Sequence, residues 1–190
     1  MPHEPALEAH EHAEHAEHAA HANDPFISRV SITVAVLAVL AATVGSLETI
    51  EAGKAITASS EAVLSQDKAT DVWDEYEAES VKKNMYAIAA ATAAGSPLAA
   101  KYAETAKEDA AKQGALKGKA TEDEKERDKL LAASRSHEDR HHWLTAAATL
   151  LEIGIAVCTV AIITRRKAFW LGSLAMGAGG LALAAFAFLS

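Results

Sequence analysis

The chain has 190 residues, of which 50% are hydrophobic and 23% are charged, and its formal net charge is -8 at pH 7. This mixture is typical of apolar membrane spans joined to a strongly charged extramembrane segment. A nucleic-acid partner is disfavoured, because phosphate binding requires a basic face. The single cysteine, Cys158, excludes an intrachain disulfide.

Residues 1–25 form an acidic, histidine-rich tail that we expect to be disordered. Its acidic start argues against a secretory signal, which begins with basic residues. The repeat Ala-Glu-His places histidines mostly three residues apart among glutamates, a ligand set that suits a divalent transition metal. These histidines are His10, His12, His15, His18 and His21. A solvated tail that binds no cofactor is the favoured interpretation.

Three apolar runs are long enough to cross a bilayer core as helices, which takes about 20 residues. We assign the transmembrane helices to residues 26–47, 143–164 and 168–190, in contact with membrane lipid. Charge is nearly absent from these runs. The sequence therefore predicts a multi-pass membrane protein.

Orientation depends on the basic turn between the last two spans, which consists of Arg165, Arg166 and Lys167. Basic residues near membrane ends favour the cytoplasmic side. Counting crossings backward places the amino terminus in the cytoplasm and residues 48–142 in the periplasm. The predicted location is a bacterial inner membrane.

Residues 48–142 are rich in the helix formers Ala, Glu and Lys. One strong breaker, Gly-Ser-Pro at 95–97, divides this segment into two arms of nearly equal length. We expect the arms to fold back on each other. The predicted fold class is an all-α membrane protein, with three transmembrane helices and a long antiparallel helical hairpin, a coiled-coil-like stalk, between the first and second.

The stalk offers few large apolar side chains for its seam. In the first arm we assign stalk packing to Trp73, Tyr76, Val81, Met85 and Ile88, together with Val63, Leu64 and Val72. In the second arm the candidates are Leu98, Tyr102, Leu116, Leu130 and Leu131. Two such helices bury little apolar surface against a large ordering cost. We therefore expect a homo-oligomer, or a stalk completed by another membrane or periplasmic protein.

Two segments carry a resemblance: AVLSQDKATDVWDEYEAESVKKNMY at 62–86 and LTAAATLLEIGIAVCTVAIITRRKAFW at 144–170. They are similar to the bacterial membrane proteins of domain-of-unknown-function family 4337. The most specific part is the pattern Trp73, Tyr76, Ser80 and Lys83. The resemblance covers essentially the whole chain, and it implies the same three-span architecture but no assigned activity.

The residues HEDRH at 137–141 match the zinc-peptidase pattern H-E-x-x-H. On a helix, His137 and His141 share a face and could bind zinc, with Glu138 activating water. The position beside a membrane span, with no globular domain to supply a third ligand or a cleft, favours plain interfacial polar residues instead. A third interpretation is a structural metal bound across a bundle by these two histidines and His142. It is favoured more than the peptidase and less than plain interfacial polar residues.

Glu152 is near the middle of the second span, where an ionised carboxylate costs at least a few kcal/mol. The favoured interpretation is an interhelical hydrogen bond. The alternative is a proton or cation site lined by one Glu152 from each subunit.

Together these features predict a non-enzymatic, oligomeric inner-membrane scaffold or docking protein that presents its stalk outside the cytoplasm. An ion or proton channel or transporter built around Glu152 is the alternative function. A zinc peptidase at the H-E-x-x-H motif is the third.

Overall fold

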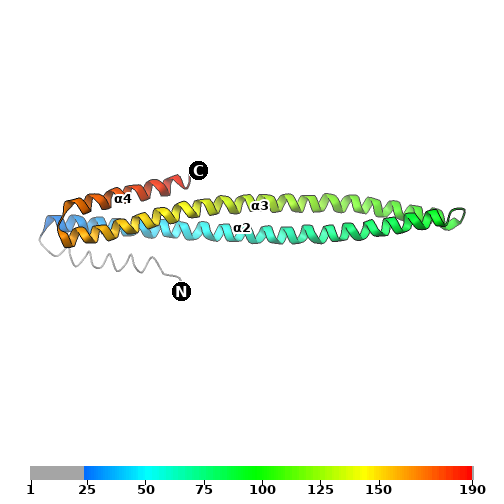
Figure 1. The fold of residues 1–190 in the computed structure, drawn as a ribbon, viewed down its shortest axis with the longest axis horizontal. Coiled ribbons are helices and arrows are strands. Elements are labelled where there is room, and N and C mark those ends of the chain that lie inside the picture. The colour runs from blue at the N-terminus through cyan, green and yellow to red at the C-terminus, as the bar shows by residue number, and fades with distance from the viewer. Residues whose placement is uncertain (1–23, 190) are drawn as a thin grey trace. The chain divides into compact units, whose positions relative to one another are not determined.

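The computed structural model describes residues 24–189, and within them the chain forms three α-helices (Figure 1). Helix α2 spans Pro25–Thr92, α3 spans Pro97–Thr164 and α4 spans Lys167–Phe186. Helices α2 and α3 have 68 residues each and run antiparallel as a hairpin, which confirms the predicted all-α class and the antiparallel helical hairpin. Of the predicted tail at residues 1–25, residues 1–23 with the five histidines lie outside the described residues, whereas Pro25 already belongs to α2.

The turn of the hairpin occupies residues 93–96, at the predicted breaker. Gly95 has a φ of 89°, a left-handed conformation that glycine adopts without the steric cost of a Cβ. The Leu98 amide donates to Ser96 Oγ at 3.2 Å, so Ser96 acts as the N-cap of α3. Pro97 then occupies the first helical position, where its missing N–H costs nothing.

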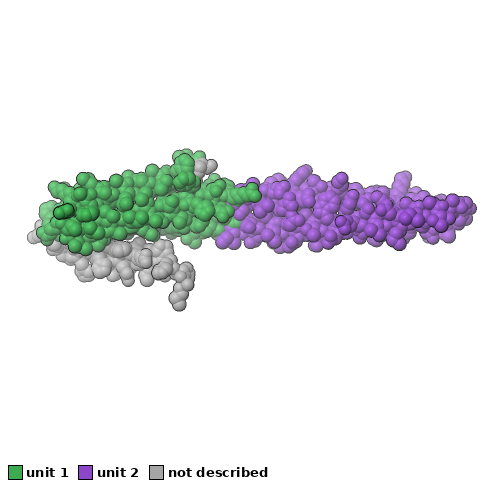
Figure 2. All heavy atoms as spheres, viewed as in Figure 1, with its two compact units in different colours: residues 1–55, 135–190 green, residues 56–134 purple. Residues whose placement is uncertain are grey.

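The hairpin divides into two compact units (Figure 2). Unit 1 comprises residues 1–55 and 135–190, and unit 2 comprises residues 56–134. Helices α2, α3 and α4 are each long and apolar enough to cross a membrane, by length and composition. The apolar segments of all three belong to unit 1.

The core of unit 1 is apolar and continuous between α2 and α3. Apart from Ala38, its buried residues on α2 recur at steps of four and three, the spacing of a coiled-coil seam. These are Val30, Val34, Leu37, Ala41 and Val44. Helix α4 contributes buried small residues at Ser173, Gly177 and Gly180, which allow its backbone to approach its neighbours closely.

The seam of unit 2 is narrow and rich in small and polar residues. On α2 the same four-and-three spacing continues through buried Ala58, Ala62, Ser65, Ala69 and Val72, half-buried Tyr76 and buried Glu79. Buried residues on α3 include Asp109, Gln113 and Ala120. Alanine fills much of the interface, as the shortage of large apolar residues predicted.

The predicted seam residues fall into two groups. Val72 is buried, and Trp73 and Tyr76 are half-buried. The assignment of Val81, Met85 and Ile88 to hairpin packing is wrong within the single chain, because they are 58%, 65% and 68% exposed. Val63, Leu64 and Leu98 are also exposed. The physical reason is register, because the four-and-three row of small residues faces α3 and turns these large side chains outward.

Candidate functional site

In unit 1 the H-E-x-x-H motif faces two glutamates of α2. His137 Nδ1 lies 2.6 Å from Glu51 Oε2, within hydrogen-bond distance. His141 Nδ1 lies 3.8 Å from Glu48 Oε1. Because the motif histidines are four residues apart on α3 and the glutamates three apart on α2, each histidine meets its own carboxylate. We call Glu48, Glu51, Lys54, His137 and His141 the boundary cluster, since it lies directly beyond the first apolar span.

Glu51 is the most buried member of the boundary cluster, with 4% of its surface exposed. It also accepts a hydrogen bond from Lys54 Nζ at 2.8 Å. Burial acts to raise the pKa of Glu51, but the hydrogen bonds and charges of Lys54 and His137 outweigh it, so this pKa lies below the usual glutamate value. Glu51 is therefore an ionised carboxylate held between two donors.

Glu48 is bound differently, because Thr145 Oγ1 donates to its Oε1 at 2.7 Å. The same hydroxyl also lies 2.9 Å from the carbonyl oxygen of His141. His141 Nδ1 is buried without a hydrogen bond. The boundary cluster thus joins α2 to α3 through polar contacts directly beside the apolar core.

The described residues give the zinc interpretation no third ligand. Within residues 24–189, no group of three or more His, Cys, Asp or Glu side chains is placed to hold a metal ion. His142 is exposed, and its ring centroid lies 5.7 Å from that of His141. Glu138 is also exposed, whereas both motif histidines are turned toward α2.

Glu152 is exposed on α3, between the buried residues Leu151 and Ile155 of the apolar core. It therefore lies on the surface of the helix pair. At the opposite end of the spans, the two residues Arg165 and Arg166 join α3 to α4. Arg165 has a positive φ of 54°, and its Nη1 lies 3.8 Å from Asp24 Oδ2.

In unit 2 the motif Trp73, Tyr76, Ser80 and Lys83 occupies the α3-facing side of α2. Trp73 Nε1 donates to Glu124 Oε1 at 3.0 Å, and its ring packs edge-on against Tyr76 at 5.3 Å between centroids. Lys83 Nζ donates to Gln113 Oε1 at 3.0 Å. Two of the four motif residues, Trp73 and Lys83, therefore contact α3 directly.

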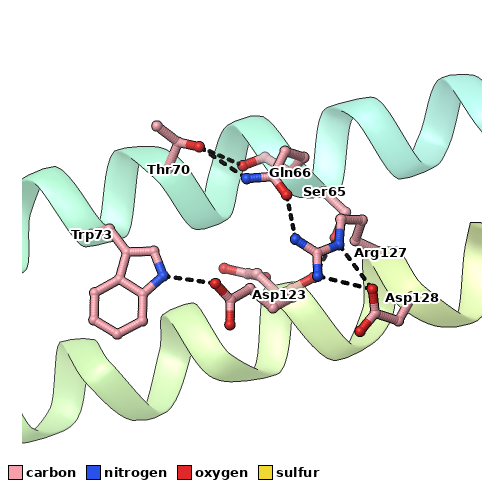
Figure 3. Close-up of polar contacts among 8 residues, drawn as sticks. Ser65, Gln66, Thr70, Trp73, Asp123, Arg127 and Asp128 are labelled. Carbon is pink, nitrogen blue, oxygen red and sulfur yellow. Dashed lines mark hydrogen bonds and ion pairs between the residues drawn. The ribbon is translucent and has the colours of Figure 1, made fainter.

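Further polar contacts join the two helices beside Trp73 (Figure 3). Ser65 Oγ donates to the carbonyl oxygen of Asp123 at 2.8 Å. Arg127 donates to Gln66 across the seam and also contacts Asp128 on its own helix. Because apolar packing is limited here, these hydrogen bonds help to fix the register of the two arms.

Sequence reasoning did not identify Glu79 and Asp109, two carboxylates buried in the same seam. Lys82 Nζ lies 2.6 Å from Glu79 Oε1, and Lys112 Nζ lies 3.4 Å from Asp109 Oδ1. The hydrogen bond from Lys82 lowers the pKa of Glu79, against the opposing effect of burial. Extending the four-and-three spacing beyond Val72 would have found Glu79.

We predict that Trp73→Phe lowers the free energy of unfolding by about 1 kcal/mol, the net value of one lost hydrogen bond. The phenyl ring keeps the edge-on contact with Tyr76 but removes the donor to Glu124. Chemical denaturation of Trp73→Phe, Glu124→Ala and the double variant forms a cycle that isolates the pair. Additive losses in the double variant would refute the coupling.

These observations define an all-α protein whose two long helices form a hairpin and whose three helices are each suited to span a membrane. The chain belongs to the DUF4337 family, a domain of unknown function, whose match covers residues 26–190. This confirms the resemblance seen in the sequence. No curated protein matches the chain. No solved structure matches it either.

Proposed function

We propose that the protein is a non-enzymatic, oligomeric scaffold of the bacterial inner membrane. Its amino terminus and the turn at 165–167 face the cytoplasm, and its hairpin is a docking stalk in the periplasm. The observation that supports this proposal is the narrow polar seam of unit 2. This seam leaves several large apolar side chains of the arms exposed, and an assembly would cover them. They are Ile56, Val63, Leu64, Val81, Met85 and Ile88.

Native mass spectrometry of the detergent-extracted full chain tests the scaffold. We expect one discrete homo-oligomer, because the exposed apolar side chains favour association. A strictly monomeric chain would refute self-assembly. A complex with a different protein would mean that the stalk binds that partner and not a second copy of the chain.

Orientation has its own test. We expect protease added to spheroplasts to cleave within residues 48–142 and to leave the turn at 165–167 intact. Cleavage at that basic turn, with protection of the hairpin, would reverse the assignment.

A channel or transporter is the second candidate, favoured by the exposure of Glu152 on α3. An exposed carboxylate at this depth could line an interface or a path between copies. If the protein conducts protons, Glu152→Gln should abolish pH-driven flux in liposomes while the oligomer persists. If wild-type liposomes show no flux under proton, sodium or potassium gradients, the channel or transporter loses its main support.

A further inference from the structure

Near the turn of the hairpin, unit 2 has an apolar surface that α3 does not cover. Val81, Met85 and Ile88 are spaced four and three residues apart on α2, so they line one face of that helix. All three are well over half exposed. We call these residues the outer stripe. Their side chains are directed away from the seam that buries Val72 and Glu79.

The outer stripe leads into a stretch without charge. Residues 84–100, a run of 17 between Lys83 and Lys101, contain no Asp, Glu, Lys, Arg or His. Elsewhere the two arms are densely charged, with 19 acidic and 14 basic residues between positions 48 and 142. Alanine predominates in this uncharged tip, so a second helix could approach its backbone closely.

We infer that the outer stripe and the uncharged tip form the contact surface for the same surface of a second copy. The inference rests on the proposed oligomeric scaffold and names the part of the stalk that associates. Two copies of a negatively charged arm repel each other wherever acidic side chains meet. At the uncharged tip that repulsion is smallest, and burial of the outer stripe favours contact.

A lipid surface is the competing occupant, and charge argues against it. Residues 74–83, which lead into the uncharged tip, contain four acidic side chains and two basic ones, Lys82 and Lys83, so this segment is net negative, and Lys82 is paired with Glu79. Anionic headgroups repel such a segment. When two copies associate through the uncharged tip, their acidic residues at 74–79 lie outside the contact, so the two helices need not touch there.

Cysteine cross-linking in the full chain tests the surface. Asp74, Val81 and Ile88 are seven residues apart, so they occupy equivalent outward positions on α2. In a Cys158→Ser background, detergent-solubilised Ile88→Cys should form disulfide-linked dimers about 10-fold faster than Asp74→Cys, as expected for a central contact against a repulsive one. The Asp74→Cys variant is the matched control, because it presents the same thiol on the same exposed face.

A second variant, Met85→Glu with Ile88→Glu, places charge on the outer stripe without touching the seam. We expect it to raise the dissociation constant of the oligomer by about 10-fold or more while helix content by circular dichroism stays unchanged. Preferential Ile88→Cys cross-linking together with this weakening would establish the contact.

The remaining outcomes separate the inference from the function on which it rests. A wild-type chain that is monomeric by native mass spectrometry overturns both. An oligomer with equal cross-linking at both positions, unaffected by the double substitution, overturns only the assignment of the surface. In a last experiment, protein held in nanodiscs is mixed with protein-free phosphatidylglycerol vesicles and tested for flotation. Flotation of the wild type that the double substitution abolishes would assign the surface to lipid and not to a second copy.

Discussion

Replacing Gly180 with leucine is expected to release α4 from α3 and to make Cys158 reactive. A Cβ on Gly180 would lie 2.9 Å from Leu151 Cγ and 3.0 Å from the backbone oxygen of Ala147. The first atom belongs to a fully buried side chain and the second to a helix backbone, so neither moves aside readily. Overpacking of this kind costs about 1–3 kcal/mol, and a leucine extends well beyond the Cβ.

Cys158 supplies a local measurement of this release. It is buried, and Ser173 Oγ of α4 donates to its Sγ at 3.3 Å. It is also the only cysteine in the sequence, so labelling reports one site. We expect a membrane-permeant maleimide to label Gly180→Leu about 10-fold faster than wild type, since local opening by about 1.4 kcal/mol raises the open population by that factor.

Gly172→Leu is the control on the same helix. The nearest atom to a Cβ at Gly172 is Val157 Cγ1 at 4.0 Å, an ordinary contact, and the residue is exposed. The added side chain is the same, but it enters open space. Labelling at the wild-type rate in both variants would show that α4 is not held by close packing at Gly180.

The helix pattern could be predicted from the sequence because its determinants are local. Apolar runs longer than a bilayer core and a stretch of strong helix formers predict helices over those residues. The Gly-Ser-Pro breaker locates the turn, where Gly95 supplies the left-handed conformation and Ser96 caps α3. Two arms of equal length then leave an antiparallel hairpin as the simplest arrangement.

The faces of those helices could not be predicted as well, because packing depends on register. Large apolar side chains such as Met85 and Ile88 were assigned to the seam because of their size. The residues buried in the seam are instead small ones such as Ala58, Ala62 and Ala69. The four-and-three spacing was present in the sequence, but alanine is common throughout the arms and gives a weak signal. Buried Glu79 was missed because charged residues are seldom buried, so a glutamate at a seam position is not expected.

The H-E-x-x-H motif shows the same limit at the candidate site. Helical spacing predicts that His137 and His141 share a face, and both are directed toward α2. Their partners, Glu51 and Glu48, lie 86 residues or more away in the chain, and only the register of the hairpin brings them opposite the histidines. The local pattern therefore predicts that the two histidines share a face, whereas their interhelical partners follow only from the register of the hairpin.

Replacing Glu51 with glutamine is expected to destabilise unit 1 at neutral pH by about 1–2 kcal/mol, because hydrogen bonds to a charged group are stronger than neutral ones. Lys54 and His137 both lose their ionised partner. Thermal or denaturant unfolding of the full chain in detergent measures this difference. Glu138→Gln is the control, since it neutralises an exposed carboxylate one residue from His137.

The loss should depend on pH in a defined direction. The pKa of Glu51 is lower in the folded chain than the usual glutamate value of about 4.3. Its contribution to stability is therefore fully present above about pH 4.3 and disappears as the pH falls through the lowered folded pKa. Wild type and Glu51→Gln should converge in stability as the pH is lowered from 5 through that folded pKa, while Glu138→Gln follows wild type throughout. A gap that stays constant across this range would mean that Glu51 contributes through its shape and packing, and that its charge does not hold the two helices together.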